Sequence, residues 1–258
     1  MPIFFPQILS GGTAQFPIRK RIIGRTVRNV LPDGSVIRWP DEGGRRTEWE
    51  LNYRELSAPE AGRLETFFES VQGRLRFFTF VDPTDNMFRF SEELASHPWI
   101  PEGGLGVTEG TSSPLAGLKS YRVSNSTWAP ASLTQVVEAD PAGLYCLSFW
   151  VRGAGDVAAT FDSQSPVFHR ATAEWKRVTK SFQRTTSQST VLAGISCGPG
   201  NVEVFGLQLE PQVSASGYKP TGSRAGVYRQ ARLLHDSLQS VASGPDRYAC
   251  RVRIGAFE

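Results

Sequence analysis

The stretch YCLSFWVR, residues 145–152, decides the fold class of this chain. Its side chains are almost all apolar or aromatic and it lies between turn residues, which predicts a buried β-strand. Outward from it, similar strand-like stretches recur with turns between them: 135–138, 157–161, 175–182, 190–196 and 202–209. Short strands at this spacing indicate an antiparallel β-sandwich.

The composition agrees with a chain of strands and turns. The 258 residues include 25 Gly and 17 Pro, with 40% hydrophobic and 21% charged residues. This length suits two domains or one large β unit. The net charge of only +3 argues against specific nucleic-acid binding. No apolar run long enough for membrane insertion and no leader segment is found, so we expect synthesis in the cytoplasm.

The first 86 residues predict short strands around one helix. Strands are expected at 18–30, 35–39 and 47–56, with turns at Pro32-Asp33-Gly34 and at 40–44. Ser57, Pro59 and Glu60 form a strong helix start, and the helix is predicted over 58–72. Its apolar face is expected to carry Ala61, Leu64, Phe67, Phe68 and Val71. A strand at 75–81 should follow.

The last residues resemble the start of the chain in their arginine-rich style. Strands are predicted at 233–241 and 248–254, with a turn at 243–246. Two strands alone bury too little surface to be stable. We therefore expect residues 1–86 and 222–258 to form one discontinuous domain, with residues 87–221 inserted as a second domain.

The N-terminal pieces, taken in order, resemble a known family. The stretches LPDGSVIRW (31–39), RRTEWEL (45–51), LSAPE (56–60) and FFTFVDP (77–83) resemble the hub domain of phage distal tail and lambda-type minor tail proteins. The resemblance implies a β-sandwich or split-barrel hub domain with one helix that forms a ring, usually a homo-hexamer. It also implies tail tube and tail tip proteins as partners, and a place at the virion tail tip after assembly in the host bacterial cytoplasm.

The inserted domain resembles sandwich modules of the carbohydrate-binding type found in phage tail and fibre proteins. The matching stretches include LSFWVR (147–152), VFGLQLE (204–210) and YKPT (218–221). The resemblance implies a jelly-roll β-sandwich insertion domain, facing outward, that serves as structural decoration of the virion or contacts a host surface glycan. Aromatic side chains stack on sugars, and Trp128 in a polar loop and Trp99 are the candidates. Trp150 and Trp175 lie in strand patterns typical of a core.

The residues do not predict an enzyme, a cofactor or a metal site. His97, His169 and His235 are isolated. The three cysteines lie far apart and are expected to be reduced. Glycoside hydrolysis needs two carboxylates across a groove, and the sequence cannot pair its candidates. These are Glu138, Asp140, Asp162, Glu174, Glu203 and Glu210.

The arginines near the N-terminus admit three interpretations: a solvated face, a subunit interface of charge pairs, or the wall of a DNA channel. The similar number of acidic residues disfavours the last. The interface candidates are Arg19, Arg21, Arg25, Arg45 and Arg46. Two functions therefore remain at this stage: a structural ring component of a phage-like tail, or a carbohydrate-binding (less favoured, carbohydrate-cleaving) module that acts on host glycans.

Overall fold

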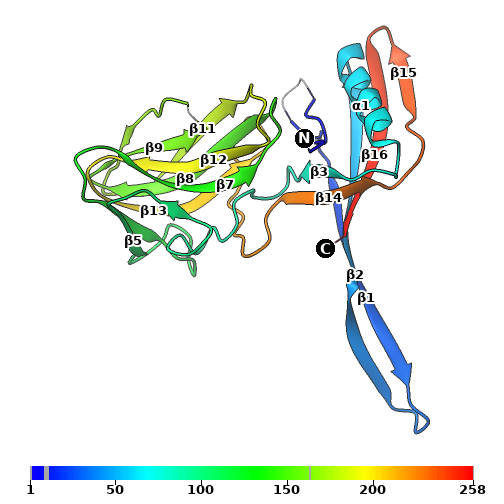
Figure 1. Cartoon of the computed structure of the whole chain (residues 1–258), viewed down its shortest axis with the longest axis horizontal. Helices are drawn as coiled ribbons and strands as arrows, with labels where there is room; N and C mark the ends of the chain where they lie inside the picture. The colour runs from blue at the N-terminus through cyan, green and yellow to red at the C-terminus, as the bar shows by residue number, and fades with distance from the viewer. Residues whose placement is uncertain (1, 9–11, 163, 258) are drawn as a thin grey trace. The chain divides into compact units, whose positions relative to one another are not determined.

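The computed structural model describes residues 2–8, 12–162 and 164–257. The chain is mainly β, with one α-helix and three antiparallel sheets in the described part, so the predicted fold class is confirmed. It divides into two compact units. Unit 1 comprises Met1–Phe80 and Tyr228–Glu258, and unit 2 comprises Val81–Val227 (Figure 1). The sequence analysis places the corresponding boundaries at 86/87 and 221/222.

Unit 1 is built on a six-stranded sheet with the order β1-β2-β16-β14-β3, in which β15 also pairs with β16. Its elements are β1 (Arg19–Val30), β2 (Val36–Leu56), α1 (Ala58–Val71), β3 (Phe78–Val81), β14 (Val227–Leu233), β15 (Ser240–Gly244) and β16 (Arg247–Phe257). Strands β1 and β3 are therefore the two opposite edges of this sheet.

Helix α1 covers one face of that sheet. The helix starts at Ala58, as predicted. The Ser57 backbone N–H donates to the Glu60 carboxylate at 3.0 Å, as a capping box requires. Leu64, Phe67 and Val71 are buried, whereas Phe68 is only half-buried. The helix packs on apolar side chains of β2, β3 and β16, which form one core. That core includes Trp49, Leu51, Tyr53, Phe78, Phe80, Val252 and Ile254.

The turn predicted at 40–44 is wrong. Strand β2 runs through it without interruption, and the irregularity is absorbed by a register shift between Ile23 and Arg25 in the pairing of β1 with β2. Glycine permits the close approach: a Cβ on Gly44 would lie 2.7 Å from the Arg25 Cβ. Two glycines here therefore make a bulge and not a chain reversal.

Two further strand predictions in unit 1 need correction. The strand predicted at 75–81 begins only at Phe78. The single strand predicted at 233–241 is the end of β14 and the start of β15, with a crossing segment between them. In that segment the Leu234 N–H donates to the Arg253 carbonyl at 2.9 Å, so the chain follows β16 without forming a continuous ladder. The turn at 243–246 joins β15 to β16, as predicted.

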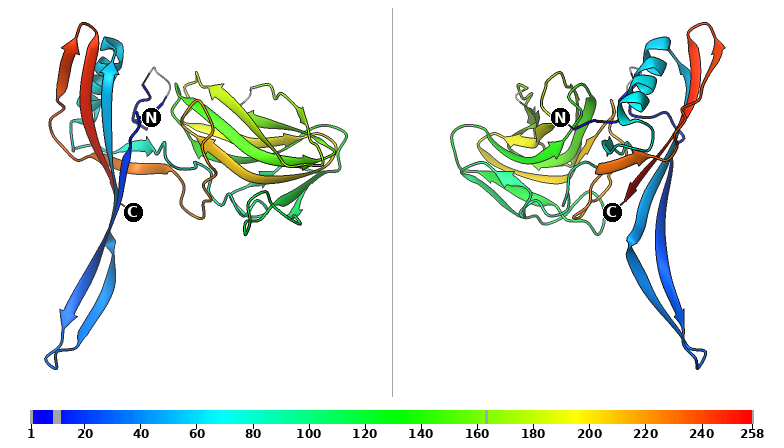
Figure 2. Two further views of the ribbon diagram at one scale, coloured as in Figure 1. Left: turned by 180° about the vertical axis from the view of Figure 1, so that it is seen from behind. Right: turned by 45° about the vertical axis from the view of Figure 1, so that its right-hand side comes forward.

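Unit 2 is a jelly-roll sandwich of two five-stranded antiparallel sheets (Figure 2). One sheet has the order β10-β9-β12-β7-β4, and the other has the order β11-β8-β13-β6-β5. The bounds are β4 (Ile100–Pro101), β5 (Leu105–Glu109), β6 (Tyr121–Asn125), β7 (Ala131–Glu138), β8 (Leu144–Gly153), β9 (Asp156–Phe161), β10 (His169–Arg170), β11 (Lys176–Gln183), β12 (Thr190–Cys197) and β13 (Gly200–Glu210). The stretch 145–152 lies in β8, between β11 and β13.

The distal part of the β1–β2 hairpin projects from the sheet of unit 1 (Figure 1). We call residues 25–41 the hairpin arm. Strand β2 pairs with β16 only from Arg46 onward, so the arm is a two-stranded ribbon without a third strand. In β1, every residue except Ile23 is exposed.

Candidate functional site

The most exposed large apolar side chain in the described part of the chain is Trp128, at 93% exposure. It lies in the connection between β6 and β7, within unit 2. Large aromatic side chains normally bury 150–250 Å² of surface, so a tryptophan held in water is an unfavourable arrangement in the free protein. Trp128, which the sequence analysis selected as a glycan contact, is therefore available to a ligand.

The loop that carries Trp128 is held in one conformation by the side chain of Asn125, which is 4% exposed. Its Nδ2 donates to the carbonyls of Ala129, at 2.8 Å, and Cys197, at 2.9 Å. Its Oδ1 accepts from the backbone N–H of Thr127 at 2.9 Å. One buried amide thus bonds to two residues of the loop, Thr127 and Ala129, and to the end of strand β12.

A second contact fixes the same loop from the side of β5. The Ser126 N–H and the Ser126 hydroxyl both donate to the Gly104 carbonyl, at 3.2 and 3.0 Å. Gly104 has a φ of +87°, and a Cβ there would lie 2.4 Å from the Thr127 Cγ2, so only glycine allows this packing. Trp128 is consequently presented by a preorganised loop, which reduces the entropy cost of binding.

The other tryptophans of unit 2 have structural environments. Trp99, the second predicted glycan contact, is 5% exposed; its ring packs against Phe88 and its Nε1–H donates to the Phe90 carbonyl at 2.9 Å. It offers no free face to a sugar. Trp150 and Trp175 lie under arginines: the Arg177 guanidinium is 4.3 Å from the Trp150 ring, and that of Arg152 is 4.8 Å from the Trp175 ring.

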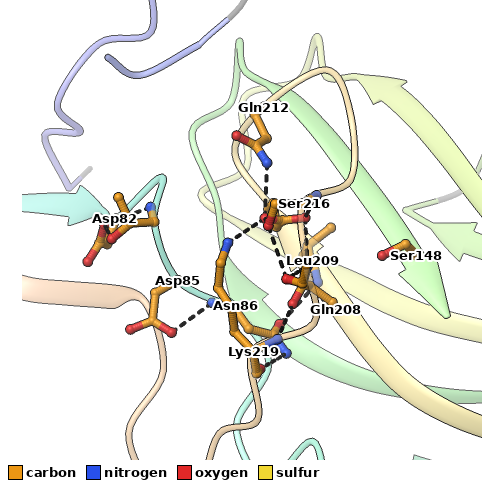
Figure 3. A network of polar contacts seen from close by, with 12 residues as sticks. Asp82, Asp85, Asn86, Ser148, Gln208, Leu209, Gln212, Ser216 and Lys219 are labelled. Carbon is orange, nitrogen blue, oxygen red and sulfur yellow. Dashed lines mark hydrogen bonds and ion pairs between the residues drawn. The ribbon is translucent and has the colours of Figure 1, made fainter. Parts of the chain in front are cut away.

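A buried polar network closes one side of the sandwich (Figure 3). The Glu210 carboxylate is fully buried and accepts hydrogen bonds from Lys219 Nζ at 2.7 Å and from the Ser216 N–H at 3.0 Å. Asn86 donates to the Leu207 carbonyl and accepts from the Leu209 N–H, both at 3.0 Å. Buried polar groups need hydrogen-bond partners, and here β13 and its neighbouring segments supply them for each other. These contacts therefore hold the segment 211–221 and the start of unit 2 against β13.

Ion pairs also occupy two further carboxylates among the catalytic candidates. Asp162 pairs with the buried Arg184 at 2.8 Å. Glu203 pairs with Arg152 at 2.7 Å and with Arg122 at 3.5 Å. Together with Glu210, three of the six carboxylates considered for hydrolysis thus serve in structural pairs. Among the described residues, no group of three or more His, Cys, Asp or Glu side chains could hold a metal ion.

The cysteines of the described chain are unpaired and unreactive. All three cysteines have free thiols, with Cys146 and Cys197 buried. Burial raises the pKa of Cys197 to about 12 and that of Cys250 to about 11, which makes both poor nucleophiles at neutral pH. The one helix of the described chain is too short and too polar to cross a membrane.

The arginines selected as interface candidates are partly used within the chain. Arg19 pairs with Glu50 at 3.2 Å, Arg46 pairs with Glu48 at 2.9 Å, and Arg25 pairs with Asp41. Arg21 and Arg45 lie exposed on β1 and β2. Exposed pairs of this kind contribute little to stability, about 0–1 kcal/mol. The Arg19–Glu50 and Arg25–Asp41 pairs join the two strands of the hairpin. Whether these arginines also contact a neighbouring subunit stays a prediction.

Comparison with solved structures finds similar folds over about half of the chain. No protein-family model and no curated protein matches the chain. Among solved structures, the enzymatically active domain of tailspike protein 4 from bacteriophage CBA120 is 15% identical, with a TM-score of 0.42; the match covers 51% of this chain and 22% of that one. The CBM22-1 xylan-binding domain of Xyn10C from Paenibacillus barcinonensis is 14% identical, with a TM-score of 0.40, over 52% of this chain and 99% of that domain. TmCBM61, solved with β-1,4-galactotriose, is 19% identical, with a TM-score of 0.37, over 49% and 99%.

The sequence analysis missed Asn125, which positions the candidate loop. The signal was present, because Asn followed by Ser and Thr at the end of a strand is a favoured Asx-turn sequence. The burial of Asn125 and its bond to Cys197, 72 residues away, depend on the packing of the two sheets. No local pattern encodes that contact.

Proposed function

We propose that this chain is a non-enzymatic binding protein whose unit 2 contacts a surface glycan through Trp128. The observation that carries the proposal is the 93% exposure of Trp128 on a loop pinned by the buried Asn125. A jelly-roll sandwich with one rigid, exposed indole has the geometry needed to stack on the apolar face of a sugar ring. The loop is held in one conformation without a ligand, so little ordering entropy would oppose binding.

The expected gain from this contact is sufficient for recognition. Aromatic side chains bury 150–250 Å² when fully covered. At about 25 cal/mol per Å², covering half of the Trp128 side chain contributes about 2–3 kcal/mol. That free energy corresponds to a factor of roughly 30–150 in the dissociation constant. A single exposed tryptophan of this kind supports weak binding, which several copies displayed together would strengthen.

The test is binding to an array of bacterial surface oligosaccharides, followed by calorimetric titration with any positive. Trp128→Ala should weaken binding by roughly 30-fold or more, and Trp128→Tyr should retain most of it. Val136→Ala, an exposed apolar residue at 52% exposure on β7, is the matched control and should bind as the native chain does. Equal affinity of Trp128→Ala and the native chain would contradict the proposal.

A second candidate function is favoured by the hairpin arm of unit 1. We propose that the chain assembles with copies of itself into a ring at a phage-like tail tip, with tail tube and tip proteins as neighbours. The support is the arm itself, an exposed ribbon that no described strand of its own chain covers. Native mass spectrometry over a range of concentrations tests assembly. A monomer at every concentration and in the assembled particle would contradict it.

A further inference from the structure

A pocket of about 580 Å³ lies within unit 1, where the sheet is interrupted. Strand β16 pairs with β14 at 254–256 and with β15 at 247–250, and no described strand pairs with it between these two ladders on that side. The connection 234–239 between β14 and β15 passes this gap and supplies one wall of the pocket (Figure 1). The volume falls in the range of roughly 300–1,000 Å³ that is typical of small-molecule sites.

The wall is held in place by the side chain of His235. Its Nε2 accepts from the Arg253 backbone N–H at 3.1 Å, and its Nδ1–H donates to the Ser237 carbonyl at 2.7 Å. The ring also stacks on Phe68 of α1, with 6.1 Å between the ring centres. Both ring nitrogens are occupied, so the pocket has a fixed wall without any ligand.

Three arginines line this pocket: Arg54 from β2, and Arg251 and Arg253 from β16. We call them the pocket arginines. Alternate residues of a strand share a face, and Arg251 lies directly opposite Asn52, two residues before Arg54. All three are exposed, whereas Val252 between the two arginines of β16 is buried. Three positive charges therefore lie on one face of the sheet.

The pocket lacks a carboxylate that could balance these charges. No Asp or Glu is among the described residues that line it. Glu50, directly opposite Arg253, accepts from Arg19 at 3.2 Å, and Asp236 in the connection pairs with Arg74 at 2.6 Å. Within the described parts of the chain, none of the pocket arginines forms an ion pair. The site therefore has an excess of positive charge that an anion would neutralise.

The donor groups of the pocket suit a phosphate group. A guanidinium has five N–H donors and no acceptor, and its planar fork matches phosphate oxygens in pairs. The Arg251 Nε donates to the Asn52 Oδ1 at 3.1 Å, which orients this guanidinium and leaves its other N–H groups for a ligand. A phosphate monoester carries roughly 1.5–2 negative charges at neutral pH and presents three acceptor oxygens. Three guanidiniums match that charge better than they match a single carboxylate.

We infer that this pocket binds the phosphate group of a small phosphorylated organic molecule. The pocket volume leaves room for an organic group beside the phosphate, and Ser237 and Gln239 line the wall that would face it. The site belongs to unit 1 alone. It depends neither on glycan binding by Trp128 nor on self-assembly.

Calorimetric titration of the full chain with glucose 6-phosphate at low salt tests the site. We expect saturable binding that weakens as sodium chloride is added, because the contacts are ionic. Arg251→Gln and Arg253→Gln should each weaken it by roughly tenfold or more, since each removes a charge-assisted contact. Arg28→Gln is the matched control: it removes one exposed charge on the hairpin arm and should change the affinity by less than about twofold.

Circular dichroism checks the fold of the three arginine variants, which change only exposed side chains. Equal losses in Arg28→Gln and Arg251→Gln would show that the whole basic surface attracts the ligand and would overturn the site. Absence of saturable binding of both glucose 6-phosphate and inorganic phosphate to the native chain would also overturn it.

Further ligands and one variant separate this inference from its alternatives. Glucose should not compete with glucose 6-phosphate, and Trp128→Ala should bind glucose 6-phosphate as the native chain does; loss in Trp128→Ala would place the ligand at the glycan site and overturn the inference. Citrate should bind more weakly, and tighter binding of citrate would overturn the assignment to phosphate. A short single-stranded oligonucleotide that binds more tightly than glucose 6-phosphate, with the same loss in Arg251→Gln, would overturn the small-molecule assignment in favour of nucleic acid.

Discussion

The hairpin arm of unit 1 and strand β8 of unit 2 both carry apolar and aromatic strand residues, in opposite environments. The arm carries Val27, Ile37 and Trp39 in water, whereas Leu147, Phe149 and Val151 of β8 are almost fully buried. Strand β8 has β11 and β13 as neighbours and a second sheet beneath it. Apolar content thus indicates that a strand needs cover, but it does not indicate whether that cover comes from the same chain.

The comparison predicts the largest loss of stability in the buried cores. Phe67→Ala should lower the free energy of unfolding by about 3–5 kcal/mol, because it removes buried apolar surface and leaves a cavity. Phe67 is 7% exposed and contacts Phe5 and Phe78 edge to face. Denaturant unfolding followed by tryptophan fluorescence measures the change. Phe68→Ala, at a half-buried position, should cost clearly less; an equal cost would show that the helix packs on a different face.

An intermediate effect is expected at the loop of unit 2. Asn125→Ala should lower the free energy of unfolding by about 1–3 kcal/mol, because the Thr127 N–H and two carbonyls lose their buried partner. It should also weaken glycan binding, since Trp128 would no longer be held in place. Thermal unfolding and titration on the same variant measure both. Unchanged binding with reduced stability would mean that the orientation of Trp128 does not matter.

A smaller effect should appear as a pH dependence that arises from buried thiols. Burial raises the pKa of Cys197 from an ordinary value of 9.0 to about 12. Above pH 9 the unfolded thiol loses its proton while the folded one keeps it, so the unfolded state binds fewer protons and stability falls as pH rises. Between pH 9 and 10 the loss is about 1 kcal/mol for this thiol. Between pH 9 and 10, the free energy of unfolding of Cys197→Ala should fall by about 1 kcal/mol less than that of the native chain. An identical pH dependence of the two proteins would contradict the linkage.

The smallest change in stability is expected in the arm. Trp39→Ala removes a large side chain, yet it should shift the free energy of unfolding of the isolated chain by no more than about 0.5 kcal/mol, because the side chain is 47% exposed and lies outside both cores. The main effect of Trp39→Ala is expected on the proposed self-assembly through the arm. A loss of several kcal/mol in the monomer would show that the arm packs on its own chain and would remove the contrast with β8.

Local patterns predicted the elements whose signals lie in consecutive residues. The capping residues Ser57 and Glu60 located α1, and apolar runs located most strands of unit 2. The bulge at Gly43 and Gly44 was missed, because a turn and a bulge use the same residue types and only the pairing with Arg25 distinguishes them. The short strands β4 and β10 were also missed, since two residues carry no periodicity, and so were the five-residue strands β5 and β6.

The candidate site was predictable only in part, for the same physical reason. A tryptophan in a polar loop indicated Trp128, and its exposure agrees with that choice. Trp99 has a similarly polar neighbourhood in sequence, but Phe88 and the Phe90 carbonyl enclose it. Exposure depends on which distant segments pack over a side chain, and that information is absent from the local sequence.

The arginines of β1 have one more consequence, which concerns the chain before it meets any partner. Strand β1 is a sheet edge, and no strand of the described residues lies beside its outer row of backbone N–H and C=O groups. Such an edge is a template for uncontrolled strand addition and fibril growth. Arg19, Arg21, Arg25 and Arg28 place repeated positive charge along this edge. Two copies that joined edge to edge would bring these like charges together, so the arginines disfavour strand addition at this edge.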